Sequence, residues 1–409
     1  MSWPLVRIGQ VTEVNPRLPK ETDETQLVSF LGMASVSEDG KLISEEARVL
    51  SETKKGFTYF TDKDVLLAKI TPCFENGKCL YASQIQNPIG YGSTEFHVIR
   101  ASPEELDSKY LFYMVWSNNF RFYGEHAMFG AAGQRRVSAD FIRGYEIPLP
   151  PLKEQKRIAA ILDKADAILR KRKQAITLAD EFLRSLFLDM FGDIITSKES
   201  LVSFGEVVKI DAKMVDPREA DYLDFVHIGP DRISKESGKL LPALTAREEG
   251  LISKKFLYDE RYVLYSKIRP YLRKCALAVG TGLCSADMYP IRAISGVTTR
   301  EFLWMLLLSN FFTNYTETLP DRASIPKLNR NELKSFSFSL PSLDLQKEFS
   351  KIVVKAVNLN SKSIKALRQS EIAFNALSQK AFSGQLSGAA ITKAEQLTQQ
   401  DMEADCPKA

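Results

Sequence analysis

Two stretches of the chain carry apolar or small residues at alternating steps of three and four. The first stretch occupies positions 158, 162, 165, 169, 176, 179, 183, 186 and 190, and only Arg172 breaks the series. This spacing is typical of the a and d positions of a coiled-coil seam. It predicts a long helix that begins after Pro151 and ends at Gly192, because a glycine often follows the last turn of a helix.

The second stretch repeats these seam positions at one constant offset of about 191 residues and is predicted to end at Gly384. Asn360, Ser363 and Ser370 make its seam more polar than the first. Its apolar members are Phe349, Val353, Ala356, Leu367, Phe374, Leu377 and Ala381. Each helix is expected to span about 38 residues, or roughly 57 Å. Two such seams favour helices that pair in opposite directions; the alternative is that each helix packs only on its own globule.

A different pattern precedes the first helix. Short β-branched or aromatic runs at 27–31, 65–70 and 95–99 alternate with polar turns, which predicts strands. The stretch 104–123 is predicted to be helical. This mixture indicates an α/β globule rather than a β-sandwich.

Segments of this globule recur about 190 to 198 residues later, and repeats of that length are whole domains. The matching segments, with the earlier copy first, are 5–11 with 201–207, 65–72 with 263–270, 110–118 with 302–310, and 149–156 with 340–347. The expected fold class is therefore α+β: a tandem repeat of a mixed α/β globule followed by a long helix, the two helices pairing as an antiparallel coiled coil. The expected divisions are a globule (1–150), a central helix (151–195), a second globule (196–341), a C-terminal helix (342–386) and a polar, disordered tail (387–409).

Composition limits the class of protein without deciding it. The chain has 409 residues, 44% of them hydrophobic, and its formal charge of +4 neither requires nor excludes nucleic acid. Its cysteines, at 73, 79, 275, 284 and 406, form no Cys-x-x-Cys pair, so we expect buried free thiols rather than disulfides or a metal site. The sequence shows no signal peptide and no apolar run of membrane-spanning length, and we expect a soluble cytoplasmic protein.

The motifs of a catalytic site are not found. The sequence contains no Gly-x-x-x-x-Gly-Lys-Ser/Thr loop and no Gly-x-Gly-x-x-Gly turn. His97, His126 and His227 stand far apart, and each is expected to be a structural histidine.

A nuclease is the least favoured class of protein. Nucleases hold Mg²⁺ with clustered carboxylates and a nearby lysine, which Asp62, Asp64, Glu75 and Lys78 could in principle supply. The second copy has Asp259, Glu260 and Arg273 but no acidic residue that corresponds to Glu75. Turn and surface charges are the simpler interpretation of these residues.

Basic and amide side chains on turns recur in both copies and are the candidate binding residues. Arginine and lysine pair with guanine edges, and asparagine and glutamine with adenine. Gly130 and Gly133 would let the backbone approach a phosphate. The charges at 170–173 fan around a helix and are expected to be solvated. The candidate DNA-binding residues are Lys69, Asn76, Lys78, Gln134, Arg135 and Arg136 in the first copy, and Lys267, Arg269, Arg273, Arg322, Lys327 and Arg330 in the second.

These motifs together resemble the specificity subunits of type I restriction–modification systems. The resemblance rests on 66–72 with the Asn-Gly-Lys turn at 76–78, on 92–100, and most of all on 147–158, which leads into a long helix and is echoed at 340–347. It covers nearly the whole chain, in the family's order of recognition domain, helix, recognition domain, helix. The second copy departs from it, with Pro270–Lys274 in place of the Asn-Gly-Lys turn and Cys284–Tyr289 in place of 92–97.

The resemblance implies a subunit that reads DNA and has no catalysis of its own. Each recognition domain would read one half of a bipartite, asymmetric target, and the helices would set the spacing between the halves. The helices would also bind two modification subunits, which methylate adenine with S-adenosylmethionine, and restriction subunits that use ATP and Mg²⁺ would join them. No cofactor is expected on this chain. A coiled-coil scaffold that binds only protein is the alternative from another class.

Overall fold

The structure is a computed structural model, and it describes residues 3–83, 85–131, 133–320 and 325–386. The chain forms two compact units. Unit 1 contains residues up to Arg172 and the segment from Lys365 onward, and unit 2 contains Lys173–Ile364. Each long helix therefore contributes one half to each unit, whereas the divisions expected from sequence treat the helices as separate segments. No helix in the described part of the chain combines the length and the apolar character needed to span a membrane.

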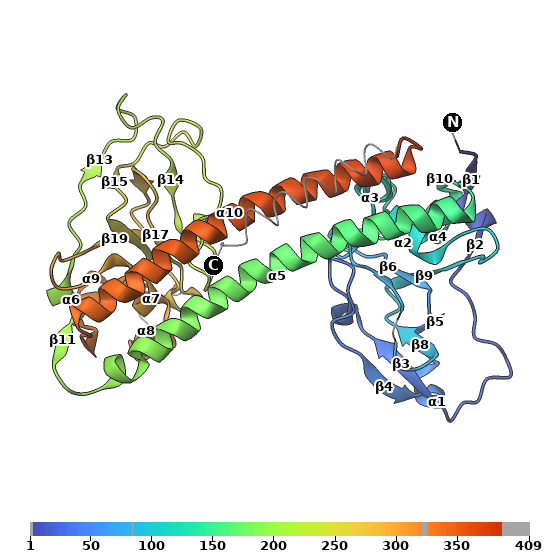
Figure 1. Cartoon of the computed structure of the whole chain (residues 1–409), viewed down its shortest axis with the longest axis horizontal. Helices are drawn as coiled ribbons and strands as arrows, with labels where there is room; N and C mark the ends of the chain where they lie inside the picture. Colours follow the sequence, from blue (N-terminus) through green and yellow to red (C-terminus); the bar gives the residue numbers. More distant parts are fainter. Residues whose placement is uncertain (1–2, 84, 132, 321–324, 387–409) are drawn as a thin grey trace, which may run out of the picture. The chain divides into compact units, whose positions relative to one another are not determined.

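Unit 1 contains two four-stranded sheets, seen on the right of Figure 1. The first is antiparallel throughout, in the order β2 (Thr12–Val14), β9 (Phe96–Ala101), β6 (Val65–Ala68), β7 (Cys79–Tyr81). The second has the order β4 (Glu46–Val49), β3 (Leu27–Leu31), β8 (Ile89–Gly92), β5 (Thr58–Thr61), with β3 parallel to β8. A further pair joins β1 (Leu5–Arg7) to β10 (Glu146–Pro148). The helices are η1 (Ile8–Gln10), η2 (Met33–Ser35), α1 (Leu50–Thr53), α2 (Ser108–Trp116), α3 (Asn118–His126) and α4 (Ala139–Gly144).

The first sheet of unit 1 is buried on both faces. Alternate residues of a strand point to opposite faces, and on β6 Val65 and Leu67 join the core formed with α2. Leu66 and Ala68 join a second core that contains Phe60 of the other sheet. The layers are therefore helices, first sheet and second sheet, as Figure 1 shows.

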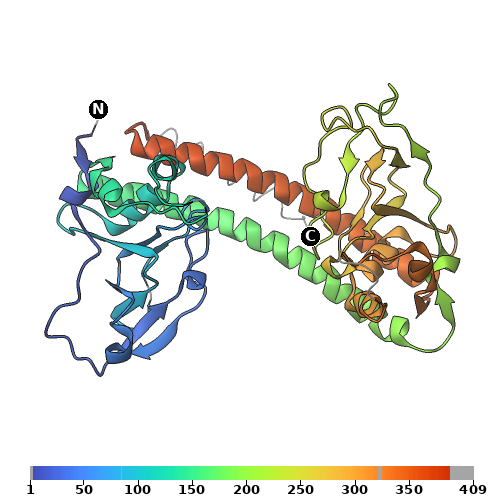
Figure 2. The same ribbon diagram turned by 180° about the vertical axis from the view of Figure 1, so that it is seen from behind.

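Unit 2 has the same order of layers, which the view from behind shows (Figure 2). Its first sheet runs β12 (Val208–Lys209), β19 (Met288–Ala293), β16 (Tyr262–Ser266), β17 (Cys275–Leu277). Its second sheet runs β13 (Met214–Val215), β15 (Lys255–Tyr258), β18 (Gly282–Cys284), β14 (His227–Ile228). The remaining elements are β11 (Leu201–Ser203) paired with β20 (Ser337–Ser339), α6 (Phe204–Val207), η3 (Pro230–Arg232), η4 (Pro270–Leu272), α7 (Arg300–Leu308), α8 (Asn310–Glu317) and α9 (Arg330–Ser335).

The second sheets share three strands and differ in the fourth. In unit 2, β14 is parallel to β18 and β15 is antiparallel to it, as β3 and β5 are to β8 in unit 1. The fourth strand is β4, beside β3, in unit 1, but β13, beside β15, in unit 2. The two units therefore keep one inner framework and differ at the edges of the outer sheet.

The long helices are α5 (Leu152–Thr196) and α10 (Leu343–Phe382), and both exceed the expected 38 residues, with 45 and 40. The end predicted at Gly192 is wrong, because α5 continues for one more turn that buries Ile195 in the core of unit 2. Gly384 lies just beyond α10 with φ +73°, as a terminating glycine should. None of the predicted seam residues on either helix is exposed, as expected for residues on the packed side of a helix.

The two helices contact each other within each unit. In unit 1, Arg172 donates to Ala366 O at 2.7 Å and to Ser370 Oγ at 2.6 Å. In unit 2, Asn360 donates to Asp180 at 3.0 Å, and the Phe349 ring lies 5.3 Å from that of Phe191. Residue numbers rise along α5 as they fall along α10, so the paired segments run in opposite directions in each unit.

Each helix also packs on a globule at both of its ends. The start of α5 (Ile158, Leu162) and the end of α10 (Leu377, Ala381) lie in the core of unit 1. The end of α5 and the start of α10 lie in the core of unit 2. The start of each helix packs on the globule that precedes it in sequence, as the alternative of separate docking expects. The end of each helix packs in the core of the other unit, which that alternative does not expect.

A buried glutamine explains the repeated motif before each helix. Gln155 donates to Pro150 O at 2.8 Å and accepts from the Asp107 N–H at 2.8 Å. Gln346 donates to Pro341 O at 2.8 Å and accepts from the Thr299 N–H at 3.0 Å. Both glutamines are fully buried, so each joins the start of a long helix to its globule.

Three other expectations change or fall outside the structure. The helix predicted at 104–123 is two helices, α2 and α3, because Ser117 ends one and caps the next. Cys79, Cys275 and Cys284 are buried free thiols, but Cys73 is only half-buried. The tail at 387–409, with Cys406, lies outside the described residues.

Candidate nucleic-acid interface

Backbone hydrogen bonds bring four of the candidate residues of unit 1 together. The Lys69 N–H donates to Glu95 O at 2.9 Å, and the Val137 N–H donates to Lys69 O at 2.9 Å. Ile70 and Arg136 form a β-bridge beside them. The end of β6, the start of β9 and the segment 129–136 therefore form one surface, which carries Lys69, Gln134, Arg135 and Arg136.

The segment 129–136 is a hairpin whose shape depends on glycine. Phe129 and Arg136 exchange backbone hydrogen bonds of 3.1 and 2.8 Å. Gly130 and Gly133 have φ of +121° and +80°, which L side chains rarely adopt. A Cβ on Gly130 would also lie 3.0 Å from Gln134 O. The backbone at these two positions therefore favours glycine, whereas the expected approach of a phosphate stays a prediction. The hairpin exposes Phe129 and Gln134.

The charged groups on this surface differ in how strongly the protein holds them. Arg136 donates to both carboxylate oxygens of Glu95, at 3.0 and 2.9 Å, and to Gln134 O at 3.1 Å. The hydrogen bond from Arg136 lowers the pKa of Glu95, and the same bond raises the pKa of Arg136. Arg135 lies 3.5 Å from Glu75. Arg136 thus holds the hairpin to β9, while Arg135 and Gln134 have the weaker internal contacts.

Asn76 and Lys78 lie on the turn between β6 and β7 and contact the protein itself. Asn76 donates to Glu38 at 2.8 Å, and Lys78 donates to Met33 O at 3.0 Å. These bonds tie the turn to the segment that contains η2. The geometry gives these two residues a structural role beside the predicted one.

We call the backbone contacts around Lys69, namely its bonds with Glu95 and Val137 and the adjacent β-bridge, the hydrogen-bond frame. Unit 2 repeats this frame. The Lys267 N–H donates to Asp287 O at 3.1 Å, the Leu328 N–H donates to Lys267 O at 2.9 Å, and Ile268 forms a β-bridge with Lys327. Lys267 thus corresponds to Lys69, and Lys327 corresponds to Arg136.

The side chains on this frame differ between the units. The buried His97 ring lies 3.0 Å from Val137 O in unit 1, and burial lowers its pKa. In unit 2 the hydroxyl of Tyr289 donates to Leu328 O at 3.1 Å in its place. Lys267 Nζ and the Arg330 guanidinium lie 6.0 and 5.9 Å from the centre of the Tyr289 ring.

The remaining candidates of unit 2 divide between this surface and another turn. Arg269 and Lys327 are exposed, and no ion pair joins either to another described residue. Arg322 lies outside the described residues. Arg273 donates to Asn310 at 2.6 Å and lies on the turn before β17.

Arg273 has a counterpart that sequence reasoning missed. In unit 1, Arg121 of α3 donates to Asn118, and a Cβ on Gly77 would lie 2.6 Å from Arg121 Nη1. Gly77 and Arg273 occupy the same place, since each precedes a lysine that donates to the carbonyl of Met33 or Pro230. A guanidinium group therefore lies beside this turn in both units: Arg121 provides it from α3 in unit 1, and Arg273 provides it from the turn itself in unit 2.

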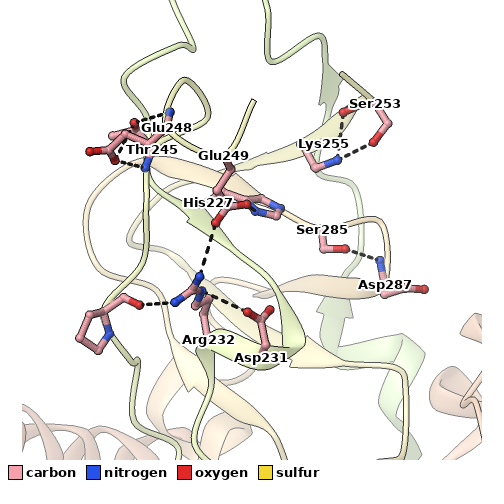
Figure 3. A network of polar contacts seen from close by, with 11 residues as sticks. His227, Asp231, Arg232, Thr245, Glu248, Glu249, Ser253, Lys255, Ser285 and Asp287 are labelled. Carbon is pink, nitrogen blue, oxygen red and sulfur yellow. Dashed lines mark hydrogen bonds and ion pairs between the residues drawn. The ribbon is translucent and has the colours of Figure 1, made fainter. Parts of the chain in front are cut away.

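A second polar network lies on the outer sheet of unit 2 (Figure 3). His227 Nδ1 lies 2.8 Å from Glu249, and Arg232 contacts Asp231 at 3.1 Å and donates to Pro242 O at 3.0 Å. Figure 3 shows these side chains beside the segment that carries Ser285 and Asp287. No sequence pattern indicated this network, because its members come from separate loops.

The carboxylates considered for a nuclease have separate partners. Asp64 is buried and bonds twice to Arg100, at 2.8 and 2.6 Å. Glu75 accepts from Thr71 at 2.7 Å. Within the described ranges, no group of three or more histidine, cysteine or acidic residues is placed to hold a metal ion.

Comparisons with known proteins give the class of this fold. Residues 2–178 match the family model of the type I restriction modification DNA specificity domain. The chain is 38% identical over 164 residues to the type I restriction enzyme EcoEI specificity subunit of Escherichia coli, a match that covers 40% of this chain and 27% of that subunit. It is 41% identical over 157 residues to the EcoAI specificity subunit of the same organism, over 38% of this chain and 26% of that one.

A solved structure extends the likeness in fold to most of the chain. The type I restriction–modification S subunit from M. genitalium superposes with a TM-score of 0.56 at 14% identity, and the match covers 93% of this chain and 96% of that one. The curated relatives are matched over only about a quarter of their length. The N-terminal part of the chain is thus similar to the type I DNA specificity domain, and the resemblance to specificity subunits is confirmed.

Proposed function

We propose that this chain is the non-catalytic DNA specificity subunit of a type I restriction–modification complex, acting in the cytoplasm. Each unit reads one half of a bipartite, asymmetric DNA target. The observation that carries the proposal is the hydrogen-bond frame that recurs around Lys69 and Lys267 with different side chains mounted on it. Two units that share this backbone frame but carry different side chains on it are suited to bind two half-sites of different DNA sequence.

Duplication is the simplest origin of the two units. The first sheets have the same strand order, and Gln155 and Gln346 make the same buried contacts. The helices then form an antiparallel coiled coil, supported by their unexposed seams and by the Arg172 and Asn360 contacts. In this proposal the pair sets the spacer between the two half-sites.

The outer faces of the helices suit partner subunits. Leu178, Phe182 and Leu188 of α5 and Val354 and Leu359 of α10 are large apolar side chains that are 46–58% exposed. Exposed apolar groups gathered on one element mark interaction surfaces. We place two methyltransferase subunits here; they bring S-adenosylmethionine, and restriction subunits that bring ATP and Mg²⁺ join them. This chain itself carries no cofactor in the proposal.

The protein-only scaffold explains less of the geometry. A scaffold needs the helices but not a glycine-dependent hairpin beside Gln134 and Arg135, nor an exposed Arg269 and Lys327. Retention of labelled duplex DNA on a filter by the assembled complex, and not by the methyltransferase subunits alone, separates the two readings.

Detection of modified bases across the host genome, with and without the gene, tests the function. We expect deletion to erase N6-methyladenine at one bipartite motif, and a plasmid copy of the gene to restore it. Restoration by a copy that lacks Lys173–Ile364 would contradict two-unit reading. Methylation that is unchanged by deletion, in cells shown to express the protein, would overturn the proposal.

A further inference from the structure

A hollow of about 560 Å³ with a mixed polar and apolar lining opens in unit 2 between α8 and α9. Tyr315 and Leu319 form its apolar wall, and the first turn of α9 supplies Arg330 and Asn331. All of these residues belong to unit 2.

One difference between the units lies at this hollow. The helices α4 and α9 correspond, since each has six residues, follows a side-chain cap and precedes the strand that pairs with the start of its unit. In unit 1 the third residue of this helix is Phe141, whose ring lies 5.5 Å from Phe120 and 5.7 Å from Tyr145. In unit 2 the same position is Glu332, whose carboxylate turns back to accept from the Asn329 N–H at 3.0 Å.

The hollow adjoins the basic surface described above. Arg330 lines it and also lies over the Tyr289 ring, which Lys267 approaches from the frame. Arg330 and Asn331 are exposed. DNA held on Lys267 and Lys327 would therefore bring a groove against α9.

Asn331 has the chemistry to read a base there. Its side-chain amide makes no hydrogen bond within the described part of the chain, and it carries both donors and an acceptor. An asparagine amide pairs with N6 and N7 of adenine in the major groove through two bonds. The corresponding residue of unit 1 is Asp140, whose carboxylate only accepts hydrogen bonds and pairs with Arg143 at 2.9 Å. The amide is thus a feature of unit 2 alone.

We propose that Asn331 determines specificity in unit 2 by pairing with an adenine of its half-site, with the DNA seated against the hollow between α8 and α9. This inference rests on the proposed function and adds one residue and one base to it.

Genome-wide mapping of N6-methyladenine in a deletion strain that carries variant genes tests it. The wild-type gene should give a motif with an A·T pair in each half. Asn331→Ala should relax the motif at one position of one half-site by at least about fivefold in base preference, the lower end for a bidentate contact. The other half-site and the spacer should stay unchanged. Asn331→Asp preserves the size of the side chain, and because a carboxylate accepts from cytosine N4 it should shift that position toward C·G.

The control is Asp140→Ala in unit 1, which should leave both half-sites unchanged. A wild-type gene that yields no motif overturns the proposed function, whereas a wild-type motif that both Asn331 variants leave unaltered overturns this inference alone. If the variants lower the overall level of methylation but keep the motif unchanged, Asn331 contacts the DNA backbone rather than a base. That result also overturns the inference. If Asn331→Ala abolishes methylation, the isosteric Asn331→Asp variant decides the question.

Discussion

Arg136 donates hydrogen bonds to both carboxylate oxygens of Glu95, and these bonds hold the glycine hairpin of unit 1 to the start of β9. The same arginine donates to Gln134 O, so most of its donors are used inside the protein. Arg135, one residue away, has only a 3.5 Å contact with Glu75. Arg136 therefore positions the hairpin, whereas Arg135, with its weaker internal contact, is the one of the two arginines that we expect to contact DNA.

Separate substitutions should distinguish these two roles. Arg135→Ala should weaken binding to one half-site by about 1–3 kcal/mol, the value of one good base contact, and leave thermal stability unchanged. Arg136→Ala should lower both affinity and stability, because it leaves the Glu95 carboxylate without its partner. Binding of the assembled complex to target DNA and thermal unfolding measure the two effects. Equal loss of stability in both variants would contradict the division.

The same ion pair should make stability depend on pH. The hydrogen bond from Arg136 holds the pKa of Glu95 below its ordinary value of 4.5 in the folded protein. A lowered folded pKa contributes stability that is present above the ordinary value and is lost as pH falls through the lowered one. Glu95→Gln should therefore be less stable than wild type at pH 6, and the difference in urea midpoint should shrink below about pH 4.5. A difference that stays constant with pH would show that the charge of Glu95 does not stabilise the fold.

The features of the fold that could be predicted from the sequence are those that follow from periodic patterns of apolar residues. The strand at Leu27–Leu31 has the predicted bounds, and every predicted seam residue of α5 and α10 is buried or half-buried. The predicted stop at Gly192 failed because the core contact of Ile195 stabilises another turn, which a local glycine signal does not reveal. Arg121 was missed because its role depends on the space above Gly77, a relation between residues far apart in sequence.

The buried glutamines should be strong contributors to stability. Gln155→Leu would leave Pro150 O and the Asp107 N–H buried without their partner, and each orphaned group costs about 1–3 kcal/mol. The exposed neighbour Lys156→Ala should change stability by less than about 0.5 kcal/mol. Urea unfolding of the two variants checks this. Near-equal midpoints would mean that the amide contacts contribute little to the attachment of α5.

The basic surface of unit 2 should contact phosphates as well as bases. Lys327 is exposed beside the Ile268 bridge, and Lys327→Ala should lower affinity for all duplexes alike. Loss of one phosphate contact should reduce the slope of log affinity against log salt by about 0.9. Titrations of target and unrelated DNA at several salt concentrations measure this slope. An unchanged slope together with an altered motif would instead make Lys327 a base reader.

Ile176 and Leu178 lie two residues apart on α5 and point in different directions. Ile176 is 9% exposed in the seam, whereas Leu178 is 53% exposed. Ile176→Asp should destabilise the protein by at least about 2–5 kcal/mol, the range for removing a large buried side chain, and the buried charge adds to that cost. Leu178→Asp introduces the same charge at the surface and should leave the urea midpoint within about 0.5 kcal/mol of wild type.

Leu178→Asp should have little effect on stability but a clear effect on the binding of the methyltransferase subunits. A charge at Leu178 would have to be desolvated when a partner covers it, so Leu178→Asp should weaken assembly while the chain stays folded. Analytical ultracentrifugation of the purified components measures assembly. Normal assembly by Leu178→Asp would remove this face from the partner surface, and normal folding by Ile176→Asp would show that the seam does not need to close. If Leu178→Asp assembles poorly at an unchanged urea midpoint, the exposed face of α5 binds the partner subunits, and the face that carries Ile176 holds the fold together.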